Sequence, residues 1–329
     1  MIDRRTFVVF VAGNLMAVPG RAVAQPAAKV TRVGFLFPGT ARSRYFAQRA
    51  DAFRFGMRDL GYEEGRNLMI EFRWADDDYD RLPALAAELV ALKVDVIVTG
   101  GGPATRAAIQ ATRTIPIVFA TVGDAVATGV VADLARPGGN ATGTTFFSPE
   151  LTAKRLELLR EAIPSLKQAA LLVNSGNSGA KPVQQAVEAT AKAMKIGLRT
   201  YDARKAGEIE GAMAAMARDR VDALVLFEDG MLVRSSPIIA DAALRQRIPA
   251  AAGQDFVEAG GMLGYGIRLS DRYREAAIFV DKIWKGAKPG DLPVLRPTKF
   301  ELVINMKTAK ALGVTIPQPM FLRADDVIQ

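Results

Sequence analysis

From residue 30 onward, short apolar runs rich in β-branched residues alternate with longer stretches whose apolar residues recur at helical spacing. The first pair is the run 33–37, which ends in Pro38-Gly39, and the helical pattern of 45–60. Strands that alternate with helices form parallel sheets covered by helices on both faces. Further strands are predicted over 68–74, 94–98 and 116–120, and further helices over 82–92 and 104–112.

The same alternation starts again after residue 150. Strands predicted over 169–173, 198–202, 223–227, 249–252 and 262–267 alternate with helices predicted over 151–162, 183–194, 208–217 and 237–247. Two series of about equal length predict two α/β domains, each a doubly wound parallel sheet. The remainder is predicted as a helix over 271–284, a connector over 291–297, a strand over 300–304, a short helix over 307–312 and a tail from Gln318.

The first 24 residues have the order of parts expected of a cleavable signal peptide. Arg4 and Arg5 precede an apolar run over 7–18, and Ala22-Val23-Ala24 offers the small-x-small pattern of a cleavage site. A buried N-terminal helix is the alternative. The paired arginines also fit the twin-arginine export route. We therefore expect residues 1–24 to be removed and the mature chain to work in the periplasm.

The composition excludes several kinds of chemistry. The 329 residues contain neither cysteine nor histidine, which excludes disulfides, histidine-ligated zinc and catalysis by serine–histidine or cysteine–histidine pairs. The formal charge of +8 falls to about +6 without the leader, and it is scattered along the chain. Because no basic run and no second apolar run of about 20 residues occurs, we expect neither a nucleic-acid partner nor a membrane span.

Two motifs that resemble cofactor or metal sites are incomplete. Gly100 and Gly102 follow a predicted strand, but Thr105 stands where a dinucleotide-binding loop has its third glycine. The acidic stretch 76–80 lacks the glycine and the final glutamate of a calcium loop. Acidic residues suit the N-terminal approach to the helix predicted from residue 82. We expect no cofactor, no metal ion and no enzymatic activity.

Small and polar residues follow the predicted strands. In an open parallel sheet, ligands bind beyond the carboxyl ends of the strands. Backbone N–H groups and helix N-termini at these ends favour anions such as carboxylates, and the carboxylates of Asp124, Glu228 or Asp255 could receive an ammonium group. The alternative is ordinary turn chemistry for the polar residues and core packing for the aromatic ones. The candidate ligand-binding residues are Pro38, Gly39, Thr40, Tyr45, Gly101, Gly102, Thr121, Asp124, Phe146, Asn174, Ser175, Glu228, Asp229, Asp255 and Tyr265.

Two long segments resemble a known family. Residues 129–143 read GVVADLARPGGNATG, and residues 297–313 read PTKFELVINMKTAKALG. Both resemble signature segments of a family of ABC-transporter substrate-binding proteins that includes tryptophan- and tyrosine-binding members. The segment FVEAGG at 256–261 and the pair Tyr265-Gly266 are also similar. Together these matches span nearly the whole mature chain.

The resemblance implies the fold of type I periplasmic binding proteins, with two lobes, a hinge of three crossovers and a central cleft. It implies a first lobe of residues 30–146 and 270–290, and a second lobe of 147–269 and 291–329. This sequence departs from the family pattern near the expected cleft, where Ala125 and Ser175 replace usual prolines and Gly264 replaces a usual serine. These departures imply that the ligand can differ from the aromatic amino acids of the family.

The function implied is that of the extracytoplasmic solute-binding component of an ABC importer. Such a protein would capture a small carboxylate-bearing solute, an amino acid or an aromatic acid, by hinge closure. We expect it to be a monomer that docks transiently on an inner-membrane permease. One alternative is an exported sensor that presents the same closed lobes to a receptor. A second is an exported enzyme on the same fold, for which no nucleophile with its base is visible.

Overall fold

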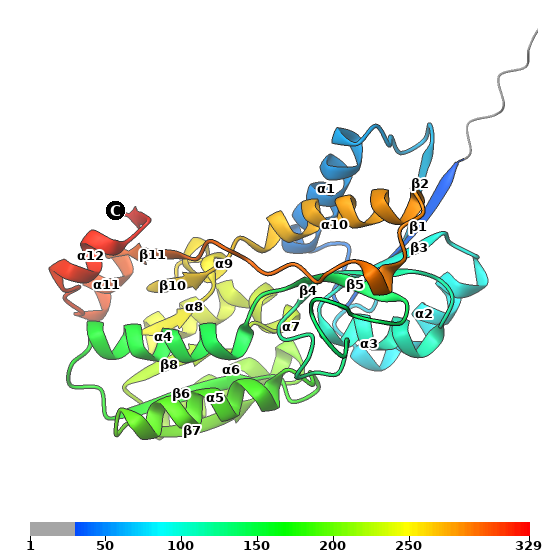
Figure 1. The fold of residues 1–329 in the computed structure, drawn as a ribbon. Helices are drawn as coiled ribbons and strands as arrows, with labels where there is room; N and C mark the ends of the chain where they lie inside the picture. Colours follow the sequence, from blue (N-terminus) through cyan, green and yellow to red (C-terminus); the bar gives the residue numbers. More distant parts are fainter. Residues whose placement is uncertain (1–29) are drawn as a thin grey trace, which may run out of the picture.

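The computed structural model describes residues 30–329, and the predicted leader 1–24 lies outside these residues. The chain forms two α/β lobes, each built on its own sheet (Figure 1). We call β1–β5 with α1, α2, α3 and α10 the first lobe. We call β6–β12 with α4–α9, α11 and α12 the second lobe. The sequence-based prediction of two doubly wound, mostly parallel sheets is confirmed.

The first sheet has five parallel strands in the order β2-β1-β3-β4-β5. Helices α1 and α10 cover one face over a core rich in phenylalanine, and α2 and α3 cover the other. In Figure 1, α10 lies beside α1 although more than 200 residues separate them in sequence. The elements are β1 Thr31–Phe37, α1 Arg44–Asp59, β2 Leu68–Trp74, α2 Leu82–Ala91, β3 Val96–Gly100, α3 Gly102–Ala111, β4 Ile117–Val122, β5 Ala141–Thr145 and α10 Leu269–Trp284.

The second sheet has seven strands in the order β12-β11-β10-β9-β8-β6-β7, parallel except for the antiparallel pair β10–β11. Helices α4 and α5 pack together, and α6 packs with α8. The elements are α4 Ser148–Ala162, β6 Gln168–Val173, α5 Ala180–Ala193, β7 Gly197–Asp202, α6 Ile209–Arg218, β8 Ala223–Leu226, α7 Gly230–Arg234, α8 Ser236–Arg245, β9 Ala250–Ala252, α9 Gln254–Glu258, β10 Leu263–Gly266, β11 Glu301–Asn305, α11 Met306–Leu312, α12 Gln318–Arg323 and β12 Asp326–Ile328. Short 3-10 turns occur at Tyr79–Arg81, Ala206–Glu208 and Pro289–Asp291.

The structure contains elements that the sequence pattern did not predict, namely β5, α7, α9, α12 and β12. The chain from Gln318 is not a tail, because α12 follows and β12 pairs with β11 at the sheet edge. Strand β5 was not predicted, since its sequence Ala-Thr-Gly-Thr-Thr has no apolar run. Its threonines are nevertheless buried because their hydroxyls donate to carbonyl oxygens: that of Thr142 to Leu292 at 2.8 Å, and that of Thr144 to Ala120. A polar strand is stable in the interior when its side chains are hydrogen-bonded in this way.

The chain crosses between the lobes three times: after β5, after β10, and on the way to β11. The crossing segments meet in a small apolar cluster of Phe146, Leu151, Ile267 and Leu269, with Phe300 packed against it. Leu292 and Leu295 hydrogen-bond to β5 before the third crossing. The start of the range 291–329, which the resemblance assigns to the second lobe, therefore lies against the first sheet. The lobe boundaries proposed from the resemblance stay a prediction.

Gly143 sets how closely β5 can approach β4. Its φ is +152°, and a Cβ at this position would lie 2.0 Å from the carbonyl oxygen of Phe119. We expect Gly143→Ala to lower the free energy of unfolding by about 3 kcal/mol or more, because the two strands must separate. Thermal unfolding measures this. Gly207→Ala is the control, since nothing lies within 4 Å of its Cβ position, and equal melting temperatures for the two variants would contradict the close approach.

Glu301 joins the second and third crossing segments. Its carboxylate accepts from Gln254 Nε2 at 2.7 Å, and it pairs with Lys299 Nζ at 2.6 Å and Arg268 Nε at 3.1 Å. The hydrogen bond from Lys299 is the main reason that the pKa of Glu301 falls from 4.5 to about 2. Because the folded-state pKa is depressed, the resulting stability is present above pH 4.5 and is lost as the pH falls toward 2.

We therefore expect the melting temperature to fall between pH 5 and pH 2 by less in Glu301→Gln than in the unchanged protein. Glu210→Gln is the matched control, since Glu210 is an exposed carboxylate on α6. Differential scanning calorimetry across this pH range gives the comparison. A pH dependence that is the same in Glu301→Gln and the control would show that the crossing segments do not depend on this carboxylate.

Candidate functional site

A cavity of about 50 Å³ lies between the lobes, enough for a few water molecules. It sits where the carboxyl ends of the strands of both sheets face each other. The first sheet reverses its winding between β1 and β3, and the second between β6 and β8. Such switch points are where open parallel sheets leave a crevice. Most residues that line the cavity lie at or just after the carboxyl ends of β1, β3, β4 and β5 in the first lobe and of β6 and β8 in the second. Others come from α1, α10 and the 3-10 turn at Tyr79–Arg81.

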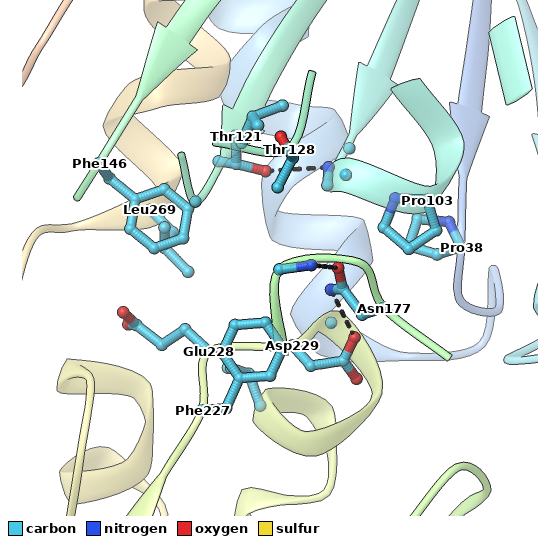
Figure 2. Close-up of a pocket in the computed structure, with 18 of the residues that line it drawn as sticks. Pro38, Pro103, Thr121, Thr128, Phe146, Asn177, Phe227, Glu228, Asp229 and Leu269 are labelled. Atoms are coloured by element: carbon cyan, nitrogen blue, oxygen red, sulfur yellow. Dashed lines mark hydrogen bonds between the residues drawn. The ribbon is translucent and has the colours of Figure 1, made fainter. Parts of the chain in front are cut away.

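Aromatic side chains supply much of the wall. In Figure 2, Thr121, Phe146 and Leu269 from the first lobe and the crossings face Phe227, Glu228 and Asp229 from the second across the open space. A wall of this kind suits a ligand with a flat apolar part. The aromatic residues are Tyr45, Phe46, Tyr79, Phe146, Phe227 and Tyr273. Burial raises the pKa of the tyrosine hydroxyls of Tyr45, Tyr79 and Tyr273, so all three stay protonated.

The N-terminus of α3 opens onto the cavity. Gly101 is its N-cap, and the φ of +83° there is one that glycine adopts without strain. The N–H of Gly101 donates to Thr121 Oγ1 at 3.2 Å. The N–H and the hydroxyl of Thr105 both donate to the carbonyl oxygen of Gly101. The first N–H groups of a helix have no partner within the helix and favour anions. Because the cavity lining contains no lysine or arginine, this terminus is its candidate group for a carboxylate.

Asp229 lines the cavity but is occupied by the protein itself. Its Oδ1 accepts from Asn174 Nδ2 at 3.1 Å and from the first amides of α7, and its Oδ2 accepts from Tyr79 Oη at 2.8 Å and Asn177 Nδ2 at 3.0 Å. A carboxylate offers about four acceptor positions. Asp229 is therefore a buried group whose acceptor positions are taken by donors of the protein itself.

Glu228 is held differently. Its side chain is 2% exposed, and its Oε2 lies 2.8 Å from Nη2 of Arg155, whose side chain is fully buried. The distance defines an ion pair, and neither atom has a hydrogen-bond partner among residues 30–329. Arg155 comes from α4 and is anchored by its Nε, which donates to the carbonyl of Tyr265 at 2.8 Å. The pair places a fixed carboxylate at the cavity wall.

Three polar contacts bridge the lobes around the cavity. The Nη2 of Arg49 on α1 donates to both carboxylate oxygens of Asp255 on α9 at 2.9 Å. The Nε of Arg234 on α7 donates to Asp77 at 3.0 Å. The third contact is the hydrogen bond from Tyr79 to Asp229. Charge-assisted and bidentate bonds are the strong members of their class, so these contacts favour the close arrangement of the lobes.

The structure separates the sequence-predicted candidates into two sets. Asp255 forms an ion pair with Arg49, and the ring of Tyr265 stacks on Phe300. Asp124 accepts hydrogen bonds from the backbone amides of Val126 and Ala127. The candidates that line the cavity are Pro38, Tyr45, Gly101, Gly102, Thr121, Phe146, Glu228 and Asp229. Those outside its lining are Gly39, Thr40, Asp124, Asn174, Ser175, Asp255 and Tyr265. Whether any member of either set binds a ligand stays a prediction.

Several lining residues were not predicted. Phe227 and Asn177 adjoin predicted loop residues, so the strand-end rule applied over a wider window would have included them. Tyr79 and Tyr273 come from a 3-10 turn and a helix, where no strand-end signal exists. Within residues 30–329 no group of three or more acidic, cysteine or histidine side chains is arranged to hold a metal ion. Over the same residues, every helix is too short or too polar to cross a membrane.

The chain is similar in sequence and in structure to several known proteins. A tyrosine-binding protein from Clostridioides difficile strain R20291 is 29% identical over 259 residues, which is 78% of this chain and 74% of that protein. A solved structure of an ABC domain from Streptococcus pneumonia in complex with L-Trp is 25% identical, covers 91% of this chain and 99% of its own, and has a TM-score of 0.83.

A ligand-free, open structure of a substrate-binding protein with adhesive properties from Clostridium difficile is also 25% identical. It covers 91% of this chain and all of its own, with a TM-score of 0.64. The fold is that of type I periplasmic binding proteins. The sequence model of the ABC transporter substrate binding protein family matches residues 46–328. The chain therefore belongs to the family of ABC transporter substrate-binding proteins.

Proposed function

We propose that this protein is the extracytoplasmic solute-binding component of an ABC importer, and that it captures a small aromatic, carboxylate-bearing solute between its lobes. The observation that carries the proposal is the aromatic cavity at the meeting point of the two sheets, with a helix N-terminus opening onto it. No reaction is needed, because the lobes only enclose the solute. The protein would act as a monomer and pass the solute to a permease.

The chemistry of the cavity suits such a solute. The phenyl and phenol rings of the wall offer faces and edges for an aromatic group. The first amides of α3 would take a carboxylate without any cationic side chain. The relative named a tyrosine-binding protein and the structure with L-Trp bound point to the same class of solute.

Closure about the crossing segments is the second part of the proposal. At equal sequence identity, the chain matches the L-Trp complex with a TM-score of 0.83 and the ligand-free open structure with 0.64. This difference supports a closed arrangement of the lobes here, as do the bridging contacts of Arg49, Tyr79 and Arg234. A ligand shifts such an equilibrium by its preference for the closed state.

Titration of the mature protein tests the proposal directly. We expect L-tyrosine or L-tryptophan to bind in calorimetry and to reduce the radius of gyration in small-angle X-ray scattering, because closure brings the lobes together. A panel of aliphatic amino acids and aromatic acids serves for comparison. If no solute in the panel both binds and compacts the protein, the proposed function is wrong.

The bridge between Arg49 and Asp255 should contribute to ligand affinity although Asp255 does not line the cavity. We expect Asp255→Asn to weaken binding by about 10-fold, because about 1.4 kcal/mol of closed-state stabilisation is lost. The ligand-free protein should also become more extended in scattering. Asp241→Asn is the matched control, since Asp241 pairs with Arg245 within α8. An affinity in Asp255→Asn equal to that of the control would exclude a role of the bridge in closure.

A further inference from the structure

The acidic side chains at the cleft differ in how much of their hydrogen-bonding capacity the protein uses. Asp229 accepts from five donors, and Asp255 takes two bonds from Arg49. Asp124 accepts from two backbone amides of its own loop. Glu228 is the exception among these carboxylates: within residues 30–329 its buried Oε2 has no hydrogen-bond partner and only the ion-pair contact with Arg155.

The ion pair of Glu228 and Arg155 is built into the cavity wall. Two glycines make room for it: a Cβ at Gly253 would lie 2.2 Å from Glu228 Oε1, and a Cβ at Gly266 would lie 3.0 Å from Arg155 Nη2. Buried polar atoms without hydrogen-bond partners are costly, and a buried ion pair is stable only if further hydrogen bonds satisfy its atoms. The unused capacity of Glu228 at a cavity wall therefore points to a donor supplied from outside the chain.

A primary ammonium group has the required chemistry. It carries three N–H donors and one positive charge, so it can donate a charge-assisted hydrogen bond to a carboxylate oxygen. In Figure 2 the Glu228 carboxylate lies on the left of the cavity, and Pro103, in the first turn of α3, lies on the right. An acceptor at one end and a helix N-terminus at the other match the two charges of a zwitterion.

We propose that Glu228, positioned by Arg155, receives the α-ammonium group of the ligand, so that the protein selects aromatic amino acids over the same acids without an amino group. This inference rests on the proposed function and adds the group that discriminates among its candidate solutes. A site built to accept a hydrogen bond rejects an analogue that lacks the donor, because its buried acceptor is then left unpaired.

The test compares two matched ligand pairs by calorimetry. L-Tyrosine is paired with 3-(4-hydroxyphenyl)propionate, and L-tryptophan with indole-3-propionate. We expect the unchanged protein to bind the amino acid at least about 100-fold more tightly in each pair. In Glu228→Gln the amino acid should bind about 100-fold more weakly, and the deaminated acid should bind as before within about threefold. Glu258→Gln, at an exposed carboxylate on α9, is the control and should keep the full preference.

Arg155 is tested by the same preference ratio. We expect Arg155→Met to reduce the ratio and Arg155→Lys to restore part of it, which a purely structural role would not do. If Glu228→Gln fails to fold because Arg155 is left without a counter-ion, the double variant Glu228→Gln with Arg155→Met removes both charges and should show the same loss of preference.

The outcomes separate this inference from the proposed function. Equal affinity of the unchanged protein for both members of a pair overturns the role of Glu228 and leaves solute capture intact. So does a preference that survives in Glu228→Gln. Absence of binding and of compaction with every compound overturns both proposals together.

Discussion

The site depends on one geometric constraint: parallel strands bring their carboxyl ends to the same edge of a sheet. In each lobe the winding reverses once, and a crevice opens between the two strands that flank the reversal. The three crossings place these crevices face to face. Residues that follow β3 and β8 thereby meet across the cleft although more than 100 residues separate them. Residues at these strand ends need only to follow their strand in order to reach the cavity.

Hydrogen-bond partners then divide similar carboxylates into different roles. Asp229 and Asp255 are both acidic and both near the cleft, yet the protein satisfies them with its own donors. Asp229 holds α7, two asparagines and Tyr79, and Asp255 joins α9 to α1. Glu228 keeps unused capacity beside a buried arginine. This difference separates the carboxylates that hold the lobes from one that keeps unused capacity at the cavity wall.

Much of the fold and part of the site could be predicted from local patterns. The alternation of strand and helix patterns gave the doubly wound sheets, and the strand-end rule led to Gly101, Thr121 and Glu228, all of which line the cavity. The same rule could not separate Glu228 from Asp124, because both follow strands and only their partners differ. Strand β5 escaped prediction because hydrogen bonds, rather than apolar side chains, keep it buried.

The sequence by itself determined the local elements, the absence of cysteine and histidine chemistry, and the family signatures, since each of these depends on residue type and spacing alone. The tertiary structure decided which polar groups are already satisfied. It also decided that Tyr79 and Tyr273 line the cavity, and that Arg155 lies against Glu228 across 73 positions of sequence. The physical reason is that hydrogen bonding and desolvation are set by neighbours in space, and those neighbours come from crossings between lobes that no local pattern encodes.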